Sequence, residues 1–170
     1  SAAAEREQAA LVYRQAKGQA LANPVLASRI KPYVTFKSIE YPNGVTYKAL
    51  SADADTKHGF NSHFVCIDEL HAQPNRELVD VLVTSTGSRR QPLIWYISTA
   101  DYMRESICNE KYDYACKVRD GLVNDPSFLP IIFEAKQGED WTDPAVWARA
   151  NPNLGVSVSL EYLRRECEKA

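Results

Sequence analysis

Two adjacent carboxylates, Asp68 and Glu69, directly follow the apolar run Phe64–Ile67. A short apolar run bounded by polar residues is typical of a buried strand, so both acids stand at a strand's carboxyl end. Ligands of open parallel sheets bind at that end. Mg²⁺ takes one or two carboxylates plus phosphate oxygens and water, and a second carboxylate can orient or deprotonate an attacking water. The alternative interpretation is solvated surface or a helix N-cap.

A second apolar run, PLIWYI, ends in Ser98, Thr99 and Ala100. If both runs are neighbouring parallel strands, these small residues meet the carboxylates at one edge of the sheet. Hydroxyl groups there could sense the γ-phosphate of a nucleotide and relay its hydrolysis. Alternatively, Ser98 and Thr99 simply cap the next helix. The apolar strand followed by Asp-Glu is the Walker B pattern of nucleotide hydrolases, and Asp68 is then expected to bind Mg²⁺ and Glu69 to activate water.

The phosphate-binding loop that usually accompanies such a site is missing from the sequence. It requires the spacing G-x-x-x-x-G-K-[ST], and none of the glycines satisfies it: Gly18, Gly44, Gly59, Gly87, Gly121, Gly138 and Gly155. The chain therefore carries the metal-binding half of an ATPase site without the phosphate-binding half. Either the chain is a fragment that starts after this loop, or it is not an ATPase.

The elements that would position these residues alternate between strand and helix. Apolar patterns and caps predict helices over 2–23, 74–88 and 105–122, a short helix near 24–30, and two short tail helices beginning near Asp143 and Ser159. Strands are predicted over 62–69, 92–100 and 127–135, with a hairpin over 33–52 that turns at Pro42-Asn43-Gly44. This order predicts an α/β fold with a parallel sheet covered by helices on both faces, and the two strands that carry the motifs are expected to be buried.

Composition limits the alternatives. The 170 residues carry a net charge of −2, so no overall basic field indicates nucleic-acid binding. No apolar run approaches the roughly 20 residues that cross a membrane. The four cysteines form no C-x-x-C pair and predict neither a disulfide framework nor a zinc site.

Four stretches, in this order, resemble the large terminase subunit of tailed bacteriophages, a DNA-packaging ATPase. They are SAAAEREQAALVYRQA, LSADADTKHGFNSHFVCIDELHAQ, SRRQPLIWYISTA and WTDPAVWARANPNLGVSVSLEYLRREC. The resemblance implies a P-loop NTPase core of the ASCE/RecA-like class, truncated at its N-terminus, over residues 1–136. An added β-hairpin is expected within it, and residues 137–170 would form a helical connector toward an absent nuclease domain.

The resemblance also implies roles and partners. Ser98, Thr99 and Ala100 would form the coupling motif, and ATP with Mg²⁺ would be used in the full-length protein. Partners would be double-stranded DNA, the portal protein and the small terminase subunit, in a homo-oligomeric ring in the host cytoplasm and with no membrane. The family's arginine finger has no arginine at the expected place, so Lys57 and Arg90 are candidates for a phosphate or DNA contact.

Two other functions stay open. Asp68 to His71 also fits the DExH box of superfamily-2 helicases, which would leave the site residues almost unchanged. A non-catalytic ATPase-like module that binds a portal or partner protein would explain the missing phosphate-binding loop without truncation. We expect the chain by itself to have little or no ATPase activity and no nuclease activity.

Overall fold

The computed structural model describes residues 1–4, 6–51 and 59–169. Lys57, one of the candidate contacts, lies outside the described residues. The chain forms two compact units, Ser1–Tyr114 and Ala115–Ala170, whose boundary falls within one helix. The domain boundary expected at 136/137 stays a prediction.

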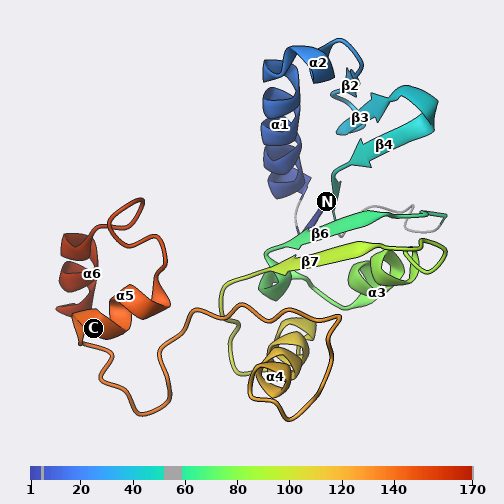
Figure 1. Ribbon diagram of the computed structural model, residues 1–170. Helices are drawn as coiled ribbons and strands as arrows, with labels where there is room; N and C mark the ends of the chain where they lie inside the picture. Colours follow the sequence, from blue (N-terminus) through green and yellow to red (C-terminus); the bar gives the residue numbers. More distant parts are fainter. Residues whose placement is uncertain (5, 52–58, 170) are drawn as a thin grey trace. The chain divides into compact units, whose positions relative to one another are not determined.

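A four-stranded parallel sheet forms the centre of the first unit (Figure 1). Its order is β5-β1-β6-β7, and its strands are β1 (Ala2–Ala3), β5 (Leu50–Ser51), β6 (Phe64–Asp68) and β7 (Leu93–Ile97). β6 and β7 pair along their whole length, from Phe64 opposite Leu93 to Asp68 opposite Ile97. The carboxyl ends of the two predicted strands therefore meet at one edge of the sheet.

Two helices cover one face of this sheet. Val65 and Ile67 of β6 are buried among side chains of α3 (Glu77–Thr84) and of the first turn of α4 (Ile107–Arg119). Leu78 and Val79 of α3 are almost completely buried there. Burying each aliphatic side chain of this kind stabilises the fold by about 1.5–3 kcal/mol, so this core fixes the strand whose end carries the carboxylates.

A second core lies on the opposite face. Ala2 belongs to the core described above, whereas its neighbour Ala3 packs with Ala9 and Tyr13 of α1 (Arg6–Ala22). Successive residues of a strand point to opposite faces, so α1 covers the face opposite α3. Helices thus lie on both faces of the sheet, as expected.

The predicted hairpin supplies two strands of a three-stranded antiparallel sheet. Its strands are β2 (Lys31–Tyr33), β3 (Ser38–Tyr41) and β4 (Val45–Lys48), in that order, and the short helix α2 (Pro24–Ala27) precedes them. The turn between β3 and β4 is the 3-10 segment η1 (Pro42–Gly44), where Asn43 and Gly44 have positive φ. Asn and Gly adopt this conformation most readily, so the predicted turn is confirmed. The strand β2 was not predicted: it ends at Tyr33, where the predicted hairpin begins, and the first arm of the hairpin supplies only β3.

Two expectations about strands are wrong. Residues 127–135 form no strand in the described chain, and Leu129, Ile131 and Phe133 are 81%, 68% and 56% exposed. Pro130 cannot donate to a ladder, and an apolar run becomes a strand only where a neighbour pairs with it.

The second wrong expectation is that β7 is buried on both faces. Trp95 is 52% exposed and packs edge-on against Phe64, which is itself half exposed. The apolar sequence of β7 therefore did not distinguish a strand covered on two faces from one covered on a single face.

The second unit contains the two predicted tail helices, α5 (Pro144–Ala150) and α6 (Leu160–Cys167). Asp143 and Ser159 cap them, accepting hydrogen bonds from the backbone N–H groups of Ala145 (2.8 Å) and Tyr162 (3.1 Å). Both predicted helix starts are confirmed. No described helix combines the length and apolar character needed to cross a membrane.

Candidate active site

Asp68 and Glu69 occupy the end of β6, as the sequence predicts. Asp68 is the last residue of the strand and is half-buried. Its Oδ1 accepts the backbone N–H of Glu69 at 3.1 Å. Glu69 has left-handed backbone angles, φ 53° and ψ 54°, which turn the chain sharply out of the sheet. The strand therefore ends at Asp68, and both carboxylates lie at the edge of the sheet formed by the carboxyl ends of its strands.

A short 3-10 helix, η2 (Leu70–Ala72), follows directly. Leu70 is 3% exposed and belongs to the core beneath the sheet, so it fixes the start of η2. His71 is next, and its Nδ1 lies 3.3 Å from Oε2 of Glu69. From the sequence, His71 was identified only as the last residue of a DExH-like motif.

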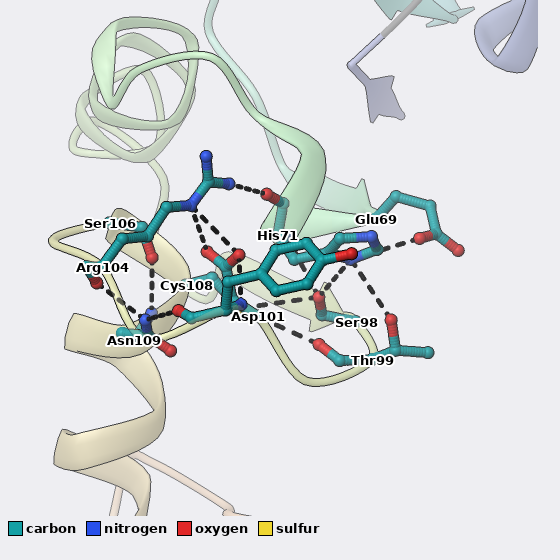
Figure 2. A network of polar contacts seen from close by, with 10 residues as sticks. Glu69, His71, Ser98, Thr99, Asp101, Arg104, Ser106, Cys108 and Asn109 are labelled. Atoms are coloured by element: carbon teal, nitrogen blue, oxygen red, sulfur yellow. Dashed lines mark hydrogen bonds and ion pairs between the residues drawn. The ribbon is translucent and has the colours of Figure 1, made fainter. Parts of the chain in front are cut away.

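Ser98 and Thr99 are brought to the same place from β7 (Figure 2). Ser98 Oγ accepts the backbone N–H of His71 at 3.0 Å and lies 3.1 Å from His71 Nδ1. Thr99 Oγ1 lies 3.4 Å from the same nitrogen. The predicted meeting of the hydroxyl residues and the carboxylates is therefore present, with His71 between them. Ala100 follows in the same loop and is exposed.

A buried carboxylate organises the loop after β7. The Asp101 side chain has no exposed surface, and it accepts hydrogen bonds from the Arg104 guanidinium (3.1 Å) and the backbone N–H of Tyr102 (2.8 Å). A hydrogen bond from the Ser106 hydroxyl is the main cause that lowers the pKa of Asp101, and the bonds from Arg104 and Tyr102 add to it. Asp101 is therefore held as a carboxylate.

Arg104 joins this loop to the segment after β6. Its Nη2 donates to the backbone carbonyl of His71 at 2.9 Å (Figure 2). Asn109 of α4 in turn donates to the carbonyls of Tyr102 and Arg104, both at 2.8 Å. Sequence reasoning missed Asp101 and Arg104. The available signal was an Asp-x-x-Arg spacing immediately after Ser98-Thr99-Ala100.

The arginines before β7 lie at the other edge of the sheet. Arg90 precedes the amino end of β7, whereas Asp68 follows the carboxyl end of the parallel strand β6. Arg90 is exposed and does not join the Asp68–Ser98 cluster. Arg89 donates from Nη2 to the carbonyl of Asn61 at 2.7 Å, a bond that stabilises the turn before β7.

The donor set fits a magnesium ion shared with phosphate better than a metal centre made by protein alone. Within the described ranges, no group of three or more His, Cys, Asp or Glu side chains could hold a metal ion. Mg²⁺ keeps several waters and is commonly bound through one or two carboxylates plus substrate phosphates. Asp68, at the ligand-binding edge of a parallel sheet, is a carboxylate of that kind.

Comparison with known proteins identifies relatives of this chain. Residues 1–117 match the family model of the terminase large subunit, ATPase domain. The terminase large subunit of Enterobacteria phage HK97 is 32% identical over 173 residues, covering 100% of this chain and 33% of that protein. Protein YmfN of Escherichia coli K12 is 38% identical over 112 residues, covering 66% of this chain and 25% of that protein.

A solved structure agrees with the sequence relatives. The crystal structure of the HK97 bacteriophage large terminase superposes with a TM-score of 0.84 at 30% identity, covering 99% of this chain and 35% of that chain. The present chain thus spans about a third of the length of its full-length terminase relative. These matches favour the terminase interpretation over the helicase alternative, and they support a P-loop NTPase-like α/β core. The chain belongs to the terminase large subunit family, and its residues 1–117 match the model of the family's ATPase domain.

Proposed function

We propose that this chain contributes the metal-binding and water-activating side of the ATPase site in a phage DNA-packaging motor. In the full-length protein, Mg²⁺-dependent hydrolysis of ATP would drive double-stranded DNA into a prohead. The observation that carries the proposal is the meeting of Asp68 and Glu69 with Ser98 and Thr99 at one edge of a parallel sheet. Membership of the terminase family supports it.

Each residue has a role that its surroundings suit. Asp68 is half-buried and oriented by the Glu69 N–H, so it can hold the magnesium that accompanies the nucleotide. The Glu69 side chain is 41% exposed, so it can reach a water molecule and orient it or take its proton. Mg²⁺ with ATP would supply charge neutralisation at the phosphates. Ser98, Thr99 and Ala100 would form the coupling motif, which links hydrolysis to movement.

The phosphates themselves need a cradle that these 170 residues do not contain, because no G-x-x-x-x-G-K-[ST] spacing is present. We propose that other parts of the terminase large subunit supply it. The partners proposed for the assembled motor are double-stranded DNA, the portal protein and the small terminase subunit. The subunits would form a ring in the host cytoplasm.

Two substitutions in the full-length protein test these roles. Asp68→Ala is expected to abolish Mg²⁺-dependent ATP turnover, because the metal loses its carboxylate. Glu69→Gln is expected to keep nucleotide affinity while lowering turnover by about 10²–10⁴-fold, the usual contribution of a general base. Steady-state phosphate release and equilibrium binding of a fluorescent ATP analogue measure the two effects.

Arg89→Gln is the control for these variants, since it alters a turn at the other edge of the sheet. Wild-type turnover in Glu69→Gln would contradict the role of Glu69. A full-length wild-type protein that binds its portal but hydrolyses no ATP would instead favour a non-catalytic binding module.

A further inference from the structure

The imidazole of His71 lies between the proposed general base and the proposed coupling motif. Its Nδ1 is 3.3 Å from Glu69 Oε2, 3.1 Å from Ser98 Oγ and 3.4 Å from Thr99 Oγ1 (Figure 2). The three distances meet at a single nitrogen, which carries either one hydrogen or one lone pair in the ring plane.

The position of the His71 backbone is fixed independently of its side chain. Its N–H donates to Ser98 Oγ at 3.0 Å, and its carbonyl accepts from Arg104 Nη2 at 2.9 Å. Arg104 is itself held by Asp101. The imidazole is therefore attached to the loop after β7 through two backbone bonds, and a displacement of that loop displaces it too.

The tautomer of the His71 ring decides whether Nδ1 donates a hydrogen bond or accepts one. A carboxylate only accepts hydrogen bonds, whereas a hydroxyl can donate or accept. When Nδ1 carries a hydrogen it can donate to Glu69, and the Ser98 hydroxyl then turns its hydrogen elsewhere, for example toward Cys108 Sγ at 3.6 Å. When Nδ1 carries a lone pair it accepts from Ser98 or Thr99, and Glu69 loses its donor.

We propose that His71 is a positioning residue whose Nδ1 bonds in turn to Glu69 and to the hydroxyl groups of Ser98 and Thr99. Through this residue the loop after β7 controls where the Glu69 carboxylate is held. The inference rests on the proposed function. It adds a physical connection, through His71, between the water-activating group and the coupling motif.

Turnover by His71 variants of the full-length terminase tests the proposal. His71→Ala is expected to lower kcat by about 10- to 100-fold, the usual cost of losing an orienting partner, with little change in KM for Mg-ATP. His71→Asn places an amide where Nδ1 stands and is expected to recover most of the turnover. His71→Gln places its amide nearer the position of Nε2 and is expected not to recover it.

Three comparisons make the result decisive. His63→Ala removes an exposed histidine at the opposite end of β6 and is expected to keep wild-type kcat. Glu69→Gln combined with His71→Ala is expected to be no slower than Glu69→Gln alone, because His71 acts through the Glu69 carboxylate. Circular dichroism checks folding, and if His71→Ala does not fold, the Asn and Gln variants decide.

Three outcomes would overturn the inference. The first is a wild-type kcat in His71→Ala, and the second is equal recovery of turnover by His71→Asn and His71→Gln. The third is a double variant whose loss of kcat equals the product of the two single losses. Glu69→Gln is measured in parallel to separate this failure from that of the proposed function. If Glu69→Gln loses turnover but His71→Ala keeps wild-type turnover, only the role of His71 is rejected. Wild-type turnover in Glu69→Gln rejects the underlying function.

Discussion

Glu69 adopts a backbone conformation that its residue type does not favour. Its φ of 53° lies in the left-handed region, where an L-residue other than Gly, Asn or Asp pays roughly 1–2 kcal/mol. The neighbours hold it there, since Asp68 is paired with Ile97 and Leu70 is buried in the core. Strain of this kind concentrates at functional sites, which agrees with the role proposed for this carboxylate.

A stability comparison tests the strain directly. Glu69→Gly and Glu69→Ala both remove the carboxylate, but only glycine relieves the left-handed conformation. Glu69→Gly is therefore expected to exceed Glu69→Ala by about 1 kcal/mol in free energy of unfolding, measured by urea denaturation of the 170-residue chain. Equal stabilities, or a more stable alanine variant, would show that the backbone relaxes at no cost.

At the scale of elements, the loop between β7 and α4 depends on the buried Asp101 carboxylate. Its pKa lies below the ordinary value because Ser106, Arg104 and the Tyr102 N–H bond the ionised form. A carboxyl group whose folded pKa is lowered stabilises the fold above its unfolded pKa of about 4, and this contribution is lost as pH falls through the folded pKa. The loop that carries Ser98 and Thr99 is consequently sensitive to acid.

We expect Asp101→Asn to be less stable than the wild type at pH 7, and the difference to shrink as pH is lowered from 4 to 2. Urea midpoints at several pH values measure it. Asp113→Asn, an exposed carboxylate on α4, controls for the loss of one negative charge. A difference between wild type and Asp101→Asn that stays constant down to pH 2 would contradict the argument.

The elements that carry the site were predictable, whereas their connections were not. Apolar runs and caps identified β6, α3, β7 and α4, because each pattern reflects burial on a core that the chain itself forms. The segment 127–135 failed, because periodicity cannot show whether a neighbouring strand is present to pair with it. The two-residue strands β1 and β5 have no pattern long enough to be recognised.

The same limit applies to the site. Asp68, Glu69, Ser98 and Thr99 could be grouped from sequence, because parallel strands bring their carboxyl ends together. The position of His71 depends on the left-handed turn at Glu69 and on the bond from Arg104, which joins residues 33 positions apart. Neither feature has a signature in a single sequence.

At the scale of the whole molecule, the chain spans about a third of its HK97 relative. The residues proposed to bind metal and to couple hydrolysis to movement are present, and the G-x-x-x-x-G-K-[ST] motif is not. Binding energy for a nucleotide comes largely from such backbone cradles around its phosphates. If other parts of a terminase subunit supply this cradle, as proposed above, this chain depends on them to bind the nucleotide.

We accordingly expect the isolated 170-residue chain to hydrolyse no ATP above the background of a Glu69→Gln sample prepared in parallel. A coupled phosphate-release assay with excess Mg²⁺ measures this. Turnover that depends on Glu69 would contradict the expectation and would require a phosphate-binding site of another kind within these residues.

Cys108 gives the loop after β7 a natural chemical reporter. The residue is 7% exposed, and its Sγ lies 3.6 Å from Ser98 Oγ and 4.0 Å from the Thr99 carbonyl oxygen. A thiol reacts with an alkylating reagent only when the reagent can reach it as a thiolate. Once the half-buried Cys66, Cys116 and Cys167 are replaced by serine, the alkylation rate of Cys108 becomes a measure of how often this loop opens. The ratio of that rate to the rate of an unprotected thiol gives the free energy of the opening.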